Sequence, residues 1–292
     1  MFSGSLVAIV TPMRPDGAVD FGAWERLLDF HAASGTSGVV VGGTTGESAT
    51  LSDSELWELT ERACAHVRKR MQVIAGAGTS STASTVERAR RLSELPIDGL
   101  LIVTPAYNRP TQEGLYQHFA AVSRAARVPL ILYNVPARTA VDMLPATVQR
   151  LSQLPGIVAV KEAVPDLERV RELVDVCPRD FAILSGDDAS ARRSVLAGAK
   201  GLISVTANVA PRAMSDMVAA AMIGDAAAAA QLDEPIAALH RDLFLEANPI
   251  PAKWALMRMR MIGSGIRLPL TELSAQYQPA VLAALSTAGV LD

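Results

Sequence analysis

Residues 157–162 read IVAVKE, four apolar residues followed by a lysine and a glutamate. A short apolar run rich in β-branched residues is typical of a strand that is buried on both faces. Lys161 falls where this strand would end, and a charged side chain there is unfavourable unless it is paired, neutralised or used. A lysine in such a place gives up its proton readily, and a neutral amine can attack a carbonyl to form a Schiff base.

The chain has four lysines, and the other three lie in less informative places. Lys69 is in a polar run, Lys200 is in a turn that leads into an expected strand, and Lys253 is in a helical segment after a proline. We therefore favour Lys161 as a nucleophile. The alternative is that Lys161 only forms a structural ion pair with a neighbour such as Glu162.

Short apolar runs alternate with longer amphipathic segments along most of the chain. We expect strands over 6–10, 38–41, 73–77, 100–103, 130–133, 157–160, 182–184 and 202–205. We expect helices over 21–33, 53–67, 81–94, 112–126, 145–154, 166–176, 188–197 and 211–223. Eight strand-then-helix units predict a parallel sheet closed into an α/β (β/α)8 TIM barrel. A doubly wound sheet is disfavoured, because no GxGxxG motif follows the first run.

The strand pattern stops at about Gly224. Further helical segments are expected over 226–243, 249–261 and 272–288, and the first begins with an alanine-rich run. We interpret that run as a close-packed helix face rather than as low-complexity sequence. The prediction is a catalytic barrel over residues 1–224 and a small C-terminal helical annex over residues 225–292.

Composition restricts the class of protein. Half of the residues are hydrophobic, and the formal net charge is −3, which argues against a nucleic-acid or anionic-membrane partner. The apolar runs are too short for a membrane span, and the first residues do not resemble a signal peptide. Cys64 and Cys177 lie far apart and suggest free, buried thiols in a reducing compartment, so we expect a cytoplasmic protein.

Polar residues follow the expected strands, where the chemistry of a barrel gathers. The loop GGTTGES at 42–48 offers backbone N–H groups and hydroxyls to a carboxylate, although a tight connecting turn would look the same. Tyr107 and Tyr133 follow the fourth and fifth runs and can transfer protons, whereas a single buried tyrosine is usually a packing residue. Arg138 can hold a carboxylate with its planar fork, or it is an exposed loop arginine.

Asp187 and Asp188 follow the seventh run and are better explained as helix-capping residues than as metal ligands, because no second cluster of ligands accompanies them. The four histidines fall in expected helices and lack metal-binding spacing. We therefore expect no metal and no other cofactor. A buried lysine, nearby hydroxyls, an anion-binding loop and one arginine together predict a Schiff-base enzyme that acts on a keto acid.

Six motifs together resemble the 4-hydroxy-tetrahydrodipicolinate synthases, also called dihydrodipicolinate synthases, of the pyruvate-dependent class I aldolase superfamily. They are GTTGES at 43–48, YNVPART at 133–139, VKEA at 160–163, LSGDDAS at 184–190, GLISVTANVA at 201–210 and ANPIPAKW at 247–254. The resemblance runs nearly from end to end of the chain. The last motif favours this family over its relatives.

The resemblance implies that pyruvate condenses with L-aspartate-4-semialdehyde, a step of lysine and diaminopimelate biosynthesis. Lys161 would form an imine with pyruvate, which tautomerises to the attacking enamine. Tyr133 would be the general acid/base, linked through Thr44 to Tyr107. In the family this last tyrosine reaches across a dimer interface into the neighbouring active site.

The resemblance also implies which residues bind the substrates. Thr45, with the backbone of Ile203, would hold the pyruvate carboxylate, and Gly186 would belong to the same site. Arg138 would hold the carboxylate of the semialdehyde. We expect a homo-oligomer, in this family usually a tetramer built as a dimer of dimers.

The chain departs from the family at the dimer-interface pocket that binds L-lysine in inhibited members. Ser48 and Ala49 are retained, but the other matching positions are occupied by Asp53, Leu56, Ser80, Ser84 and Ala106. A lysine effector would lose an aromatic wall, an amide partner and an acidic partner. We therefore expect weak or absent inhibition by L-lysine.

Two other interpretations compete with this one. The first is a related lyase of the superfamily, such as an N-acetylneuraminate lyase, a 2-keto-3-deoxy-sugar-acid aldolase or a keto-deoxyglucarate dehydratase. Arg138 beside Thr44 and Thr45 argues against these enzymes, whose aldehyde partners are sugars. The second is a barrel that binds a keto acid without turnover, which the presence of Lys161 and Tyr133 disfavours.

Overall fold

Eight parallel strands form one closed barrel, with each strand bonded to the next and β1 to β8. The computed structural model describes residues 2–67 and 69–291, and these statements concern that part of the chain. The strands are β1 Gly4–Ala8, β2 Gly38–Val41, β3 Gln72–Gly76, β4 Gly99–Val103, β5 Leu130–Asn134, β6 Ile157–Glu162, β7 Ala182–Ser185 and β8 Gly201–Ser204. The predicted TIM barrel is confirmed, and each expected strand overlaps an observed one.

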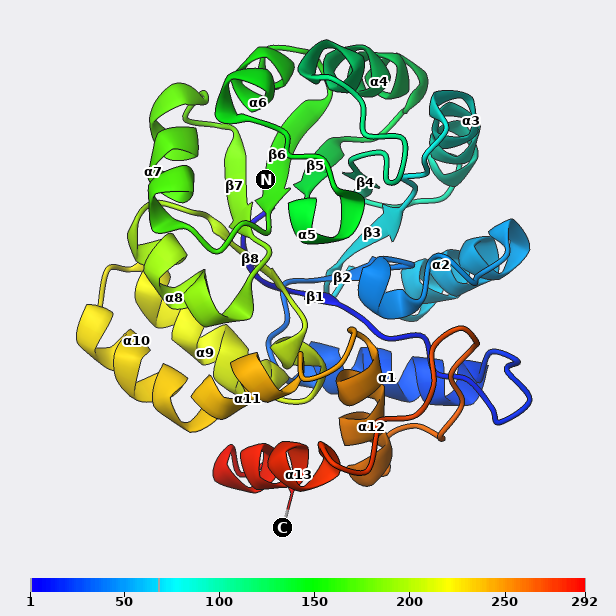
Figure 1. Ribbon diagram of the computed structural model, residues 1–292, viewed down its shortest axis with the longest axis vertical. Helices are drawn as coiled ribbons and strands as arrows, with labels where there is room; N and C mark the ends of the chain where they lie inside the picture. Colours follow the sequence, from blue (N-terminus) through cyan, green and yellow to red (C-terminus); the bar gives the residue numbers. More distant parts are fainter. Residues whose placement is uncertain (1, 68, 292) are drawn as a thin grey trace.

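Helices form a ring around the barrel (Figure 1). They are α1 Phe21–Ala33, α2 Asp53–Val67, α3 Thr82–Leu92, α4 Gln112–Ala125, α6 Pro145–Ser152, α7 Leu167–Val176, α8 Asp188–Leu196 and α9 Pro211–Met222. Local sequence explains their starts. Ser52 and Glu55 form a reciprocal capping box at α2. A short helix that the sequence pattern does not predict, α5 Pro136–Thr139, lies in the loop after β5.

The alternation of side chains along the strands separates two apolar regions. One set fills the barrel interior and includes Leu6, Ala8, Val40, Ile74, Leu101, Ile131, Tyr133, Ala159, Leu184 and Ile203. The other, larger set lies between the strands and the surrounding helices. Strand residues of opposite parity therefore meet different environments, one inside the barrel and one behind its wall.

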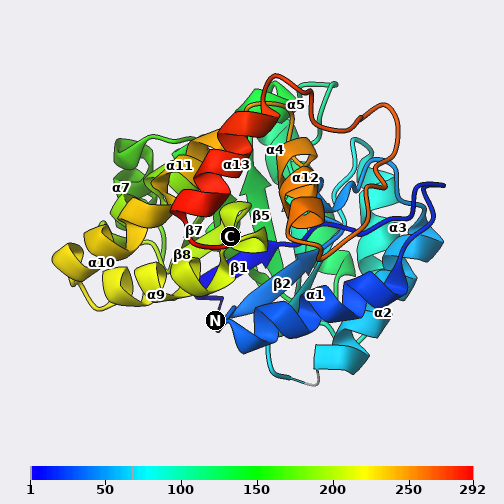
Figure 2. The same ribbon diagram turned by 90° about the horizontal axis from the view of Figure 1, so that it is seen from below.

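After α9 the chain continues as helices packed on one side of the barrel, with α13 Gln278–Thr287 beside α11 Ala237–Asp242 (Figures 1 and 2). The prediction of a single helix over 226–243 is wrong. It is divided into α10 Ala226–Asp233, the 3₁₀ turn η3 Glu234–Ile236 and α11, because Pro235 has no N–H for the helical ladder.

The other two annex helices are shorter than expected. They are α12 Ile250–Arg258 and α13, and residues 272–277 are not helical. The alanine-rich run does lie in a helix, and Ala229 is buried where α10 packs against α9. The boundary between barrel and annex at residue 224 stays a prediction.

No helix in the described part of the chain is both long enough and apolar enough to cross a membrane. Cys64 and Cys177 are free, as expected, but they are half-buried rather than buried. Burial raises the pKa of each thiol to about 11. Neither cysteine therefore has the lowered pKa of a reactive thiol.

Two buried histidines make the stability of the fold depend on pH. His31 is fully buried, with Nδ1 3.2 Å from Thr36 Oγ1, and burial lowers its pKa from 6.5 to about 3. Burial likewise lowers the pKa of His118 to about 4. Both rings stay neutral in the folded state at pH 5, whereas they bind protons in the unfolded state. Their stabilising contribution is therefore present above about pH 6.5 and is lost as the pH falls towards the lowered pKa values.

We predict that His31→Leu reduces the acid sensitivity of the fold. The melting temperature of the wild-type protein should fall between about pH 7.5 and about pH 5, and it should fall less in the variant, because one proton-binding group is removed from the unfolded state. Calorimetry at the two pH values measures the difference. A comparison of about pH 8.5 with about pH 7.5, where histidine is neutral in both states, is the control. An equal fall in both proteins would contradict the prediction.

Candidate active site

Lys161 lies on the inner face of β6, near the end of the strand, and only 4% of its surface is exposed. Tyr133 is its register partner on β5. The Lys161 ammonium nitrogen lies 4.3 Å from the centroid of the Tyr133 ring. The sheet register thus brings the expected nucleophile and the expected acid/base into contact, although 28 residues of sequence separate them.

The alternative of a Lys161–Glu162 ion pair does not fit the geometry. Consecutive strand residues point to opposite faces, so Glu162 lies behind the barrel wall. There its carboxylate accepts hydrogen bonds from the Asn134 side chain at 3.1 Å and from Val164 N–H at 2.9 Å, and Arg169 lies 3.6 Å away. Glu162 therefore has its own partners, and Lys161 is not needed to satisfy it.

The network behind β5 and β6 is polar and buried. The Asn134 side-chain amide donates to Asp142 at 2.7 Å as well as to Glu162, and its side-chain oxygen Oδ1 accepts from Met143 N–H at 2.9 Å. Burial raises the pKa of Glu162 to about 7, although the hydrogen bonds and Arg169 act in the opposite direction. This network holds the ends of the two strands that carry Tyr133 and Lys161.

Gly186, directly after β7, makes room for the lysine. A Cβ atom at this position would lie 3.0 Å from Lys161 Cε and 2.9 Å from the Ala163 Cβ. The Gly186 N–H donates to the carbonyl of Glu162 at 2.6 Å, which fixes this close approach. Gly186, expected to bind substrate, therefore lies against the Lys161 side chain. Any larger residue at this position would displace the lysine.

The Gly/Thr loop after β2 forms the 3₁₀ turn η1 Thr44–Gly46. Thr45 is buried, and its Oγ1 accepts a hydrogen bond from Asn248 Nδ2 at 2.9 Å. Glu47 ends the turn in the left-handed conformation, with φ 58°, and its side chain is also buried. The loop is thus held at a defined position at the carboxyl end of β2, where an anion-binding turn is expected.

Arg138 and Ile203 also lie at this end of the barrel. Arg138 is exposed on α5, and its guanidinium donates to the Asn248 carbonyl oxygen at 3.2 Å. Ile203 is buried in the same interior set as Tyr133. Thr45 and Arg138, which follow different strands, are therefore both linked to the annex through Asn248.

Tyr107 does not join this group within one chain. Its surface is 95% exposed, and its backbone has φ 72° in the loop after β4. That loop is tied to the turn before α3, because Ser80 Oγ donates to the Ala106 carbonyl and Asn108 Nδ2 donates to the Ser80 carbonyl, both at 2.9 Å. The ring is therefore presented outward on an ordered loop.

The prediction that both aspartates after β7 cap a helix is only half right. Asp187 caps α8 by accepting from Ser190 N–H at 2.9 Å. Asp188 is instead the first residue of the helix, and its carboxylate accepts from the N–H groups of Val205 and Thr206, each at 2.9 Å. Asp188 thus fixes the turn after β8. In the described residues, no three His, Cys, Asp or Glu side chains group as metal ligands would.

Three residues that sequence reasoning did not single out belong to the surroundings of the site: Asn248, Glu47 and Lys253. The last two form a buried ion pair between the Gly/Thr loop and α12. All three lie in the quoted motifs at 43–48 and 247–254, but a helical lysine after a proline gives no sign of burial by itself. The apolar residues on both sides of Lys253 are the sequence feature that indicates its burial.

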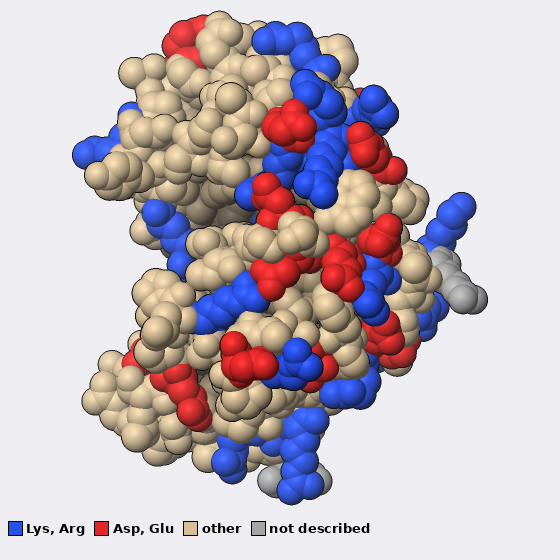
Figure 3. Space-filling view, turned by 90° about the vertical axis from the view of Figure 1, so that its right-hand side faces the viewer, with Lys and Arg blue, Asp and Glu red and all other residues tan. Residues whose placement is uncertain are grey.

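The positions that differ from the lysine-binding family pocket have partners of their own. Asp53 forms an ion pair of 2.6 Å with Arg88, and Leu56 is buried under Gly42. A groove of about 380 Å³ between α2 and α3 is lined by Asp53, Leu56, Ser84, Trp57, Arg88 and Arg91, among others. Acidic and basic side chains are interspersed on this face (Figure 3).

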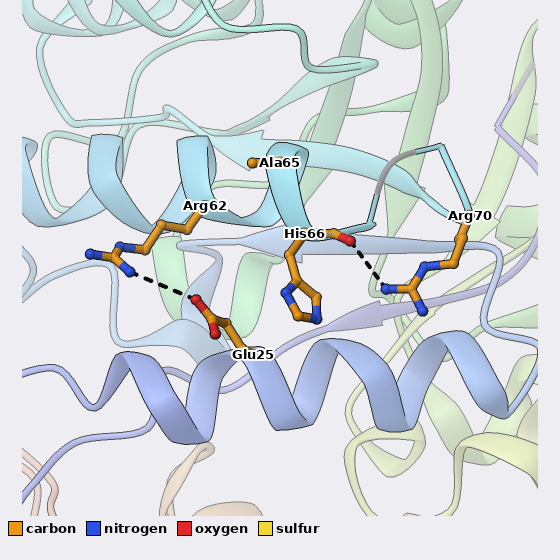
Figure 4. A pocket seen from close by; sticks show the side chains of 5 residues that line it. All are labelled: Glu25, Arg62, Ala65, His66 and Arg70. Atoms are coloured by element: carbon orange, nitrogen blue, oxygen red, sulfur yellow. Dashed lines mark hydrogen bonds and ion pairs between the residues drawn. The ribbon is translucent and has the colours of Figure 1, made fainter.

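Another groove, of about 650 Å³, lies between the outer surfaces of α1 and α2 (Figure 4). Its arginines already have partners, since Arg62 lies 3.7 Å from Glu25, and Arg70 forms an ion pair with Asp29 at 2.9 Å and donates to the His66 backbone carbonyl at 3.1 Å. The carboxyl end of α2 leads into the start of β3, so this part of the groove is at the opposite end of the barrel from Lys161.

Comparison with known proteins gives consistent results. The profile of the Dihydrodipicolinate synthetase family matches residues 1–288. The 4-hydroxy-tetrahydrodipicolinate synthases of Stutzerimonas stutzeri and Methylococcus capsulatus are 53% and 52% identical over 291 residues, with 100% of each chain covered. A crystal structure described as the chloride-inhibited dihydrodipicolinate synthase from Acinetobacter baumannii complexed with pyruvate has a TM-score of 0.98 and 47% identity, again over 100% of both chains.

We predict that Gly186→Ala slows Schiff-base formation at Lys161 by about tenfold or more, because the new methyl group must displace the lysine side chain. The measurement is the rate at which an α-keto acid is trapped on the protein by borohydride, followed by intact mass. Gly22→Ala is the matched control, since a Cβ at Gly22, in the first turn of α1, meets its nearest atom at an ordinary 3.5 Å. An unchanged rate in the Gly186 variant would refute the role given to this glycine.

Proposed function

The chain belongs to the dihydrodipicolinate synthetase family and is a lyase of the class I aldolase type, and from this membership we propose its reaction and mechanism. The reaction is the condensation of pyruvate with L-aspartate-4-semialdehyde through a Schiff base on Lys161. The product is 4-hydroxy-tetrahydrodipicolinate, in lysine and diaminopimelate biosynthesis. We place this reaction in the cytoplasm, which the free thiols of Cys64 and Cys177 support.

The observation that carries the proposal is the contact between Lys161 and Tyr133. An amine that is 4% exposed lies 4.3 Å from the centre of a phenol ring inside an apolar barrel. Imine formation needs a nucleophilic amine and a nearby group that donates and accepts protons. It is also favoured where little water reaches the amine. This pair, at the mouth of the barrel, supplies both groups.

In the first stage the neutral Lys161 amine attacks C2 of pyruvate and forms a carbinolamine. Loss of water, with a proton supplied to the leaving hydroxyl, gives the imine. Removal of a proton from C3 then gives the enamine. Tyr133 is the residue that donates and accepts these protons, because its ring lies against the lysine nitrogen.

In the second stage C3 of the enamine attacks the aldehyde carbon of the semialdehyde, and the aldehyde oxygen takes up a proton. The amino group of the adduct then attacks C2, which closes the ring and releases Lys161 as the free amine. Thr45 with the Ile203 backbone and Gly186 bind pyruvate, and Arg138 binds the carboxylate of the semialdehyde. Burial of Thr45 and exposure of Arg138 on α5 suit an inner first substrate and an outer second one.

Tyr107 completes the proton relay through Thr44 from a second copy of the chain. A tyrosine that is 95% exposed on an ordered loop is well suited to a contact with another subunit. We therefore propose a homo-oligomer in which each active site receives Tyr107 from its neighbour, assembled as a tetramer of two such dimers.

We predict that Lys161→Arg leaves a folded protein whose turnover falls by several orders of magnitude, because guanidinium cannot form the imine. Borohydride reduction with pyruvate should add one pyruvate-sized mass to Lys161 in the wild type and none in the variant. Near-wild-type turnover in the variant would refute the role of Lys161 as the nucleophile.

The same trapping in the presence of L-aspartate-4-semialdehyde tests the second substrate. Turnover should protect Lys161 from reduction. An adduct that the semialdehyde leaves unchanged would instead point to the sugar-acid lyases of the superfamily. Absence of any adduct would refute the Schiff-base mechanism.

The altered positions at the family's regulatory pocket make weak or absent inhibition by L-lysine part of the proposal. The Asp53 carboxylate is already paired with Arg88, and Leu56 is a core residue. The Ser80 hydroxyl donates to the Ala106 carbonyl in the loop of Tyr107 and does not replace the amide partner that a bound lysine would need. Two lost charge-assisted contacts of about 1.5 kcal/mol each weaken binding by more than about a hundredfold.

We predict that L-lysine does not inhibit the enzyme appreciably below millimolar concentration. A dose–response curve at fixed pyruvate and semialdehyde measures this directly. Half-inhibition at micromolar lysine would contradict the prediction and would mean that the pocket binds lysine through other residues.

A further inference from the structure

The annex contacts the Gly/Thr loop through a buried ion pair that the proposed mechanism does not use. Lys253 of α12 is 4% exposed and Glu47 of the loop is 3% exposed, and the Lys253 ammonium contacts Glu47 Oε1. The second carboxylate oxygen accepts from the backbone N–H of Arg267 at 3.1 Å. Both oxygens of Glu47 are therefore bonded to the C-terminal part of the chain.

Stability alone gives a weak reason for such a pair. Removing two charges from water is unfavourable, and buried ion pairs can often be replaced by apolar side chains of similar volume without loss of stability. Burial indeed lowers the pKa of Lys253, while Glu47 acts to raise it. What an ion pair provides and an apolar pair does not is a defined direction and distance between two parts of the chain.

Glu47 fixes the turn that contains Thr44 and Thr45. Glu47 adopts a left-handed backbone at the end of η1, and its N–H donates to the Thr44 carbonyl at 3.1 Å. Its own carbonyl accepts from the N–H groups of Thr50 and Leu51, at 3.0 and 3.2 Å. Anchoring the Glu47 side chain therefore anchors both the turn before it and the segment after it.

The same annex segment also directs the Thr45 hydroxyl. Asn248 Nδ2 donates to Thr45 Oγ1 at 2.9 Å, so this oxygen acts as an acceptor and its own hydrogen remains available to donate to an anion. The Asn248 carbonyl accepts from Arg138. Asn248 thus contacts the groups proposed to bind both substrate carboxylates, and Lys253 holds the end of the same turn through Glu47.

We propose that Asn248 and Lys253, with Glu47 as the point of attachment, form an annex clamp that positions the Thr44–Thr45 turn for binding of the pyruvate carboxylate. They are positioning residues, since they act through Thr44 and Thr45. The inference rests on the function proposed for those threonines. The helical annex is then part of the substrate site.

The test is Lys253→Met in the full-length protein. We expect the pyruvate concentration for half-maximal trapping on Lys161 to rise about tenfold, because the displaced turn binds the carboxylate poorly. The KM for pyruvate should rise to a similar extent, and kcat should fall as well because Thr44 of the proton relay moves with the turn, while the KM for the semialdehyde changes by less than about threefold. Backbone amide exchange over residues 44–51 should become faster.

A second variant, Glu47→Gln, removes the charge from the other side of the pair and should have the same effects. The double variant should be no worse than Lys253→Met alone, because both changes break one interaction. If Lys253→Met does not fold, Glu47→Gln decides the question by itself.

Two controls separate positioning from general damage. Lys200→Met removes the same charge from an exposed lysine before β8, at the other end of the barrel. Val281→Ala loosens the annex in α13 without touching the clamp. Both should keep the wild-type pyruvate dependence and the wild-type exchange over 44–51.

Pyruvate dependence within about twofold of wild type and unchanged exchange in both clamp variants would overturn the clamp. A wild-type protein that traps no pyruvate would overturn the proposed function instead. Amide exchange over residues 44–51 still decides the clamp in that case, because this readout needs no substrate.

Discussion

The hydrogen-bonded closure of eight parallel strands is the constraint on which the rest of the structure depends. Once the register is set, consecutive residues must face either the barrel interior or the surrounding helices. This places Tyr133 and Lys161 together inside and places Asn134 and Glu162 together behind the wall. A reactive lysine and a buried carboxylate can therefore be neighbours in sequence and still belong to separate environments.

The same constraint explains why the barrel could be predicted from the sequence. Strands buried on both faces need continuous apolar runs, and the intervening helices need amphipathic segments, so both patterns are local. The interior position of Lys161 follows from a charge at the end of such a run. The annex is different. The prediction of one helix over 226–243 overlooks Pro235, although a proline is a local signal. The buried ion pair of Lys253 has no local signal of this kind, because it depends on Glu47, about two hundred residues away.

In the candidate site, too, features with a local sequence pattern could be predicted and long-range contacts could not. Lys161 and Tyr133 could be predicted because each lies at the end of an apolar run, whereas Gly186 was expected only from the resemblance to the family. The contacts of Asn248 with Thr45 and Arg138 could not be predicted, since a loop–loop hydrogen bond has no periodic pattern in sequence. Asp188 is a related case, because capping chemistry favoured a helix start whereas its carboxylate holds the turn after β8.

A barrel fixes its strand ends much more firmly than its loops, since only the strands share the closed hydrogen-bonded sheet. A loop that must present a hydroxyl in one direction therefore needs a second anchor outside the sheet. The Gly/Thr turn has one at Thr11, whose Oγ1 donates to the Gly46 carbonyl at 2.7 Å, and another at Glu47. The first belongs to the barrel and the second depends on the annex, so the position of this turn depends on packing between the two.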